Sequence, residues 1–273
     1  MTSEIIIPGF TTTSLVVTAA ICIAAVLVAW YTVRGRVKFS QIILGMFCYV
    51  LVLLLENLFS LLQSATGMQT TGLGYGLYTV LSVVLAREIV RFAAMRFGVL
   101  EKFTGADASI GFAIGFAGLY LLVCGVYYFS LYSTATEYLK TGMDAFLANS
   151  GEGAEDAMAL LESVANQSGW EVLATGVNRV FFLVREISLC LMLYYAMQDG
   201  NTRGCMLVPV LHLVAMIPDG LYQAELLHNS ILRDAVTCVL SAGIAFLASR
   251  QYNAREDQVA HFRIEHLYAK RRR

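Results

Sequence analysis

Runs of about 20 consecutive apolar residues recur along this chain, with short polar segments between them. A bilayer core about 30 Å thick requires about 20 residues of α-helix to cross it. The bilayer offers no partner to free backbone groups, so each run is expected to form a helix rather than a strand. The pattern predicts seven membrane-spanning helices, over residues 14–33, 41–63, 73–97, 109–131, 173–197, 205–227 and 233–250.

Two segments lie outside this pattern. Residues 132–172 are strongly acidic and are expected to form an external loop. Within that loop, apolar residues at helical spacing over 151–166 predict a short helix across the bundle, either a solvated cover or a lid. Residues 251–273 mix charges at helical spacing and end in a basic cluster, which predicts a helical tail near anionic lipid. The organisation expected is one transmembrane domain, 1–250, followed by this tail.

The basic residues predict how the helices are oriented. Most Lys and Arg residues lie in the odd-numbered connections and in the tail, whereas the even-numbered connections hold only Lys140 and Arg233. Cytoplasmic segments carry the excess of Lys and Arg. We therefore predict an external N-terminus and a cytoplasmic C-terminus, in a multi-pass protein of a prokaryotic plasma membrane.

Composition agrees with a membrane protein and excludes other classes. Apolar residues make up 58% of the chain and charged residues 14%, whereas soluble domains carry about a quarter charged residues. The net charge of −1 argues against a nucleic-acid-binding protein, which needs a basic surface. The six cysteines form no C-x-x-C pair, so no zinc ribbon or redox dithiol is expected.

Charged residues inside the apolar runs are the candidate functional groups, since each costs about 2.5–3.5 kcal/mol at mid-span unless it is paired or hydrated. Counting residues from the cytoplasmic ends places Glu88, Glu186 and His212 at a common depth. Three helices can therefore share one polar cavity, although a lone histidine on an apolar helix is more often a hydrogen-bonded core residue. Three further acids lie nearer the outer ends of their spans and are expected in another layer: Glu56, Asp219 and Glu225.

Charge balance predicts how these groups pair. Glu88 and Arg91 are three residues apart and can pair on one helix, with Arg91 reaching the cytoplasmic interface. Arg185 and Glu186 are adjacent, about 100° apart around their helix, so each needs a partner on another helix. We predict the pairs Glu88–Arg185 and Glu186–Arg87, a network that can serve stability alone.

Four short motifs follow one another along the predicted spans. They are AREIVRF with Glu88 and Arg91, GFAIGFAGLY around Phe116, NRVFFLVRE ending at Glu186, and LHLVAMIPD with His212. Together with the basic stretch after the first span, their order resembles the YhfC family, a branch of the CAAX-protease-like (ABI) superfamily of intramembrane proteases. The resemblance covers most of the chain and implies a helical protease fold.

The resemblance also implies a site in which glutamates and histidines activate a water, with or without a metal, to attack a peptide bond. Here Arg87 stands at the first glutamate of the family's Glu-Glu-x-x-Arg motif, and Phe116 and Glu186 stand at histidines. Met216 follows His212 where the family has an acid or amide. These substitutions remove lone-pair donors, and a guanidinium repels a divalent cation. We therefore expect a degenerate catalytic centre, a pseudoenzyme, with no bound metal.

Three functions stay open. The first is a non-catalytic relative that binds lipid-embedded partners, either a transmembrane peptide or another membrane protein, in the inherited cavity. The second is an active protease with Glu88 as base and His212 as acid or oxyanion donor, and zinc as its cofactor. The third is a transporter or membrane-complex subunit whose arginines receive an anionic group. The residues expected around the cavity are Arg87, Glu88, Arg91, Phe116, Arg185, Glu186 and His212.

Overall fold

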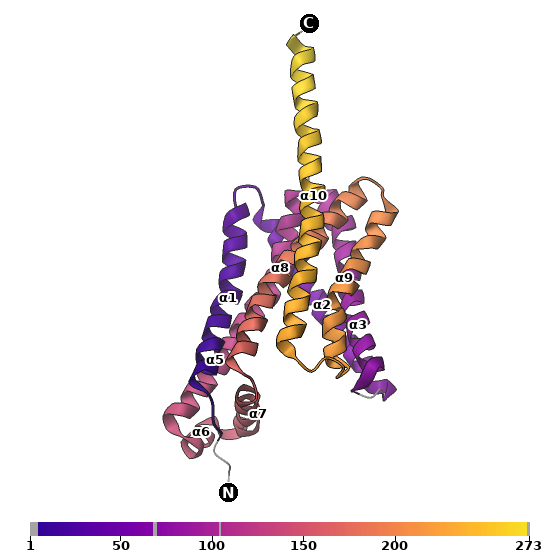
Figure 1. Ribbon diagram of the computed structural model, residues 1–273. Helices are drawn as coiled ribbons and strands as arrows, with labels where there is room; N and C mark the ends of the chain where they lie inside the picture. Colours follow the sequence, from indigo (N-terminus) through magenta and orange to yellow (C-terminus); the bar gives the residue numbers. More distant parts are fainter. Residues whose placement is uncertain (1–4, 68–69, 104, 272–273) are drawn as a thin grey trace.

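The computed structural model describes residues 5–67, 70–103 and 105–271, with side chains to Arg255 except that of Glu152. All secondary structure in these ranges is helical (Figure 1). Within them, six helices are long and apolar enough to cross a membrane, so the chain is an all-α, multi-pass integral membrane protein whose outer faces contact lipid. These helices are α1 (Gly9–Val33), α2 (Phe39–Thr66), α5 (Asp107–Thr141), α8 (Gly169–Gln198), α9 (Thr202–Gln223) and the Ser230–Arg255 part of α10 (Ser230–Arg271).

The remaining predicted span, 73–97, forms α3 (Gly72–Ala94) in the same bundle. α3 has 23 residues, three of them charged, and it is not among the six helices that are long and apolar enough to cross a membrane. It continues into a π-helix, η1 (Met95–Val99), and then into the short α4 (Leu100–Lys102). Single π-helical turns of this kind frequently occur at functional sites.

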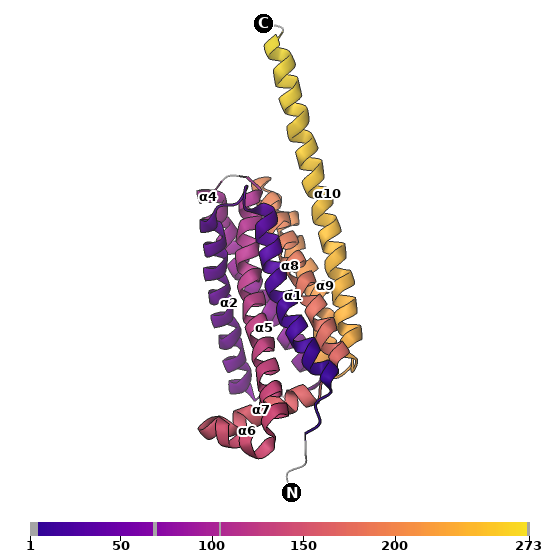
Figure 2. The same cartoon turned by 90° about the vertical axis from the view of Figure 1, so that its left-hand side faces the viewer.

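The chain begins and ends at opposite ends of the bundle (Figures 1 and 2). The short helices α6 (Met143–Ser150) and α7 (Ala154–Ala165) lie across the end where the N-terminus is found, which we call the N-terminal end. α10 runs past the other end, the C-terminal end, as a single projecting helix. The side of the membrane that each end faces stays a prediction.

The external loop predicted over 132–172 is wrong in its bounds. α5 extends to Thr141, because its apolar face continues through Leu131, Ala135 and Tyr138 at helical spacing. These side chains are buried against α6 and α7, where Leu161 is fully enclosed. The short helix predicted over 151–166 is confirmed as α7.

The sixth and seventh spans also differ from prediction at their junction. α9 ends at Gln223, so Glu225 lies outside the span, exposed, with a φ of 58° in the left-handed region. α10 begins at Ser230, and its charged start is accommodated by polar neighbours. Asp234 is buried and accepts hydrogen bonds from Thr175 (2.9 Å) and from the Asn178 amide (2.8 Å).

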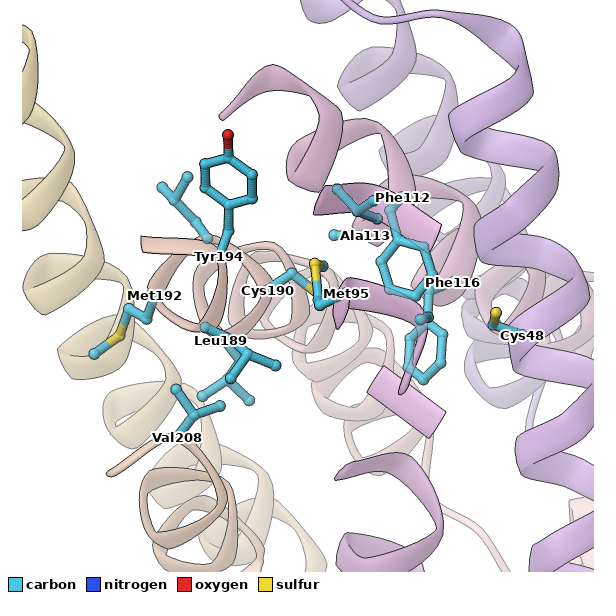
Figure 3. Close-up of a cluster of buried hydrophobic side chains, with 14 of the residues drawn as sticks. Cys48, Met95, Phe112, Ala113, Phe116, Leu189, Cys190, Met192, Tyr194 and Val208 are labelled. Carbon is cyan, nitrogen blue, oxygen red and sulfur yellow. The ribbon is translucent and has the colours of Figure 1, made fainter. Parts of the chain in front are cut away.

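α5 and α8 form the centre of the bundle. α5 packs against α1, α2 and α8, and α8 packs in turn against α1, α9 and α10. The α2–α5 contact depends on glycine: a Cβ added to Gly115 would lie 1.9 Å from the Ile42 carbonyl oxygen. Small residues of this kind allow transmembrane helices to approach closely. Figure 3 shows the apolar core beside η1, where Met95 lies with Phe112, Phe116 and Cys190.

Candidate functional site

Four ionisable side chains from three helices meet in the interior. Arg91 of α3 donates one N–H to Glu88 and another to Glu186 of α8, so one guanidinium is shared by two carboxylates. The Nδ1 atom of His212 on α9 lies 2.5 Å from Glu88 Oε1, and its Nε2 atom lies 3.8 Å from Glu186 Oε1. We call these four residues the ionic cluster. The common depth predicted for Glu88, Glu186 and His212 brings them into mutual contact.

The ionic cluster is almost completely enclosed. Arg91, Glu186 and His212 have no exposed surface, and the Glu88 side chain is 11% exposed. The expectation that Arg91 reaches the membrane interface is therefore wrong, although it does pair with Glu88. Two carboxylates withdrawn from water need a cation between them, and Arg91 supplies it.

The remaining ion pairs differ from those predicted. Arg87 points toward α2, where its Nε lies 3.3 Å from Glu56 Oε1, so Glu56 does not belong to a separate outer layer. Among the described residues, the one carboxylate within 4.0 Å of Arg185 belongs to its own neighbour, with 3.8 Å between its Nε and Glu186 Oε1. The predicted pairs Glu88–Arg185 and Glu186–Arg87 are wrong, because Arg91 lies between the two carboxylates and contacts both, while Arg87 pairs with Glu56.

Phe116 forms one wall of the ionic cluster. The guanidinium carbon of Arg91 lies 5.7 Å from the centre of the Phe116 ring, and that ring is held edge-on by Tyr49 and beside Phe112. An aromatic face stabilises a cation by its quadrupole but offers no ligand to a metal. The Phe116 ring therefore packs against the Arg91 guanidinium and helps to hold it in place.

A cavity of about 510 Å³ adjoins the ionic cluster on the side of the C-terminal end. Glu88 lies in its wall, and Arg96 is the other charged residue of the lining. We call it the apolar cavity. The rest of its surface is mainly apolar and comes from α3, α8 and α9, including Phe92, Leu193, Met197, Cys205, Met206 and Pro209.

A second cavity, of about 280 Å³, lies on the side of the N-terminal end. Its lining holds one carboxylate, Asp219, and four arginines, and we call it the arginine cavity. On each of α3, α8 and α9 the ionic-cluster residues lie between the parts that line the two cavities. The arginines are Arg87, Arg179, Arg185 and Arg233.

Sequence reasoning gave Arg179 and Arg233 no part in a site. Arg179 was detectable as a basic residue inside an apolar run, the same signal that identified Arg185 six residues later. Arg233 stands at the start of the last span and had no such signal. Only the packing of α10 against α8 and α9 brings it to the same cavity.

Comparison with known proteins identifies the family. A family model described as YhfC intramembrane metalloprotease matches residues 19–237. The chain belongs to the YhfC family. The membrane protein YhfC of Bacillus subtilis (strain 168) is 24% identical over 171 residues. That match covers 62% of this chain and 66% of the relative, just under two thirds of its length. No solved structure matches the chain.

The YhfC family's description implies a metal, and the donor set of the ionic cluster tests whether one fits. Carboxylates and an imidazole are suitable zinc ligands. However, Arg91 stands between the two carboxylates, in the place that a cation would need. Across the described part of the chain, no group of three or more His, Cys, Asp or Glu side chains is arranged to hold a metal ion. The residues of this YhfC-family member do not fit a metal-activated water.

Proposed function

We propose that this YhfC-family protein is a non-catalytic relative that binds an apolar segment of a transmembrane peptide or partner membrane protein. The segment occupies the apolar cavity, and Glu88 marks the polar end of that cavity. The observation that carries the proposal is the sharing of Arg91 between Glu88 and Glu186.

Loss of hydrolysis follows from how the lone pairs of the ionic cluster are used. A general base must direct a free lone pair at the attacking water. Glu88 Oε1 already contacts both Arg91 and His212, and Glu186 accepts from the same arginine through Oε2. Glu186 Oε1 has no hydrogen-bond partner among the described residues, but the side chain is fully enclosed, away from solvent water. A fixed guanidinium stabilises each carboxylate in its charged form and opposes the arrival of a second cation.

The apolar cavity has the properties of a binding site for an apolar segment. Its volume lies in the range of about 300–1,000 Å³ typical of ligand sites, with apolar walls and few polar groups. Pro209 lies inside α9 and has no N–H, so the carbonyl of Cys205 loses its usual helical partner. Both residues line the cavity, and the freed carbonyl is a hydrogen-bond acceptor for a peptide N–H.

Binding of a labelled leucine–alanine transmembrane peptide to the purified protein in nanodiscs tests the proposal. Met206 lines the apolar cavity and is 66% exposed, so Met206→Trp can fill the entrance without disturbing the core. We expect this variant to weaken peptide binding about tenfold or more. Leu247→Trp, on the exposed face of α10, is the matched control and should bind like the parent protein. Equal binding by both variants would contradict the proposal.

The second candidate function is an active protease in which Glu88 is the base and His212 the acid. The 2.5 Å contact between their side chains favours it, because the two groups could act on one water. The Nε2 atom of His212 is buried without a hydrogen-bond partner among the described residues, and a protonated imidazole could donate from it to an oxyanion. This candidate requires peptide cleavage that Glu88→Gln abolishes and Glu101→Gln, an exposed control outside the bundle, leaves intact.

A further inference from the structure

We propose that the arginine cavity is a binding site for a phosphate group, separate from the apolar cavity and independent of the proposed peptide site. The phosphate belongs either to a lipid head group or to a free phosphate ion. Three features of the cavity favour this ligand: the charges that face it, the unfilled hydrogen bonds of its arginines and its size.

Two of the four arginines have their charge balanced by nearby carboxylates. Arg87 pairs with Glu56, and Arg233 lies 3.6 Å from Asp219 and 2.8 Å from Asp234. Of these five residues, Arg87, Arg233 and Asp219 line the cavity.

The other two arginines, both on α8, have no carboxylate at hydrogen-bond distance among the described residues. Arg179 has no carboxylate within 4.0 Å among the described residues and lies over the ring of Tyr120, 5.0 Å from its centre. Among the described residues, Arg185 has only the Glu186 carboxylate within 4.0 Å, and its Nε lies 3.8 Å from Oε1, beyond hydrogen-bond distance, while Oε2 of that carboxylate accepts from Arg91. The lining holds four arginines against one carboxylate, so positive charge predominates at the surface of the cavity.

The same two side chains carry buried donors without acceptors. The Nε and Nη1 atoms of Arg185 and the Nε atom of Arg179 have no hydrogen-bond partner in the described structure. Arg185 is 2% exposed and lines the cavity. Buried donors are nearly always paired, and an unpaired charged donor is costly. An anionic acceptor in the cavity would satisfy them.

The geometry favours phosphate over a peptide or a metal. Guanidinium groups bind phosphate and carboxylate oxygens specifically, and a tetrahedral phosphate offers acceptors in more directions than a planar carboxylate. Asn178 also lines the cavity; its amide nitrogen donates one N–H to Asp234, which leaves the second N–H as a neutral donor. The space of about 280 Å³ holds a phosphate and its waters but is smaller than the apolar cavity.

Two measurements on the purified full-length protein distinguish the sources of phosphate. Thermal unfolding in detergent compares sodium phosphate with sodium chloride at equal ionic strength. Native mass spectrometry counts phosphatidylglycerol retained against phosphatidylcholine after exchange from mixed vesicles. Both lipids carry phosphate, so retention of phosphatidylglycerol alone would indicate that net negative charge is needed. Stabilisation by the ion supports a free phosphate, and lipid retention supports a head group. If neither the phosphate ion nor the lipid bound, the proposal would be overturned.

Variants identify the cavity as the place of binding. Arg185→Gln should weaken phosphate or lipid binding about tenfold or more, whereas Arg34→Gln, exposed at the C-terminal end, should leave it unchanged. Because Arg185→Gln removes a buried charge, a second variant keeps every arginine: Asp219→Asn removes the only carboxylate of the lining and should tighten binding about twofold or more. If Asp219→Asn bound phosphate or lipid like the parent protein, the proposal would be overturned. The same variant should bind the transmembrane peptide like the parent protein.

Discussion

Glu88 on α3 and His212 on α9 are in contact through Oε1 and Nδ1, 2.5 Å apart, although 124 residues separate them in the sequence. The same two helices also meet toward the N-terminal end, where a Cβ on Gly76 would lie 2.2 Å from the Gly220 carbonyl oxygen. A polar contact at mid-depth and a backbone contact near one end therefore fix α3 against α9. This docking holds Glu88 at the wall of the apolar cavity.

Replacing Arg91 by methionine should destabilise the protein strongly. The substitution leaves two buried carboxylates without their shared cation, which costs about 3–5 kcal/mol in comparable buried pairs. Denaturant unfolding of the purified protein in detergent measures the loss. Arg34→Met, at an exposed position, is the matched control.

The physical cause of that loss can be separated from lost packing. Adding Glu186→Gln to Arg91→Met removes one of the stranded charges, so the double variant should be more stable than Arg91→Met alone. If Arg91→Met unfolds like Arg34→Met, the ionic cluster does not hold the bundle as we describe.

The α2–α5 interface should be sensitive to a single methyl group. Gly115→Ala places a Cβ against the backbone of Ile42, which cannot move aside as a flexible side chain could. We expect a loss of about 1–3 kcal/mol in unfolding free energy. Gly243→Ala on α10 meets nothing within 4 Å and should be neutral or stabilising by up to about 1 kcal/mol. Similar stabilities for the two variants would argue against close helix contact at Gly115.

The sequence contains enough information to predict the helices but not how each one is rotated. Length and apolarity alone locate the seven long helices, and residue depth brings Glu88, Glu186 and His212 to one level. Depth does not say which way a side chain points, so the pairing of Arg87 with Glu56 could not be predicted.

The cavities depend on helix neighbours, which no local pattern encodes. The arginine cavity combines Arg179 of α8 with Arg233 of α10, and only the packing of those two helices brings them together.

The start of α8 was predicted four residues too late, although Ser168 and Glu171 form a capping box there. That signal was present in the sequence as S-x-x-E.

Labelling of intact bacterial cells tests the predicted orientation. Lys140 is exposed near the end of α5 that lies at the N-terminal end, and Arg203 is exposed at the start of α9, at the C-terminal end. The distribution of basic residues predicts that a membrane-impermeant maleimide labels Lys140→Cys and spares Arg203→Cys. The parent protein, whose six cysteines are free and buried or half-buried, gives the background. The reverse labelling pattern would place the N-terminal end in the cytoplasm.

The zinc content of the purified protein, measured by mass spectrometry after exposure to zinc and gel filtration, tests the central claim most directly. We predict zinc well below one ion per chain, unchanged by Glu88→Gln or Glu186→Gln, because Arg91 already fills the place between the two carboxylates. One zinc ion per chain that either substitution removes would contradict it.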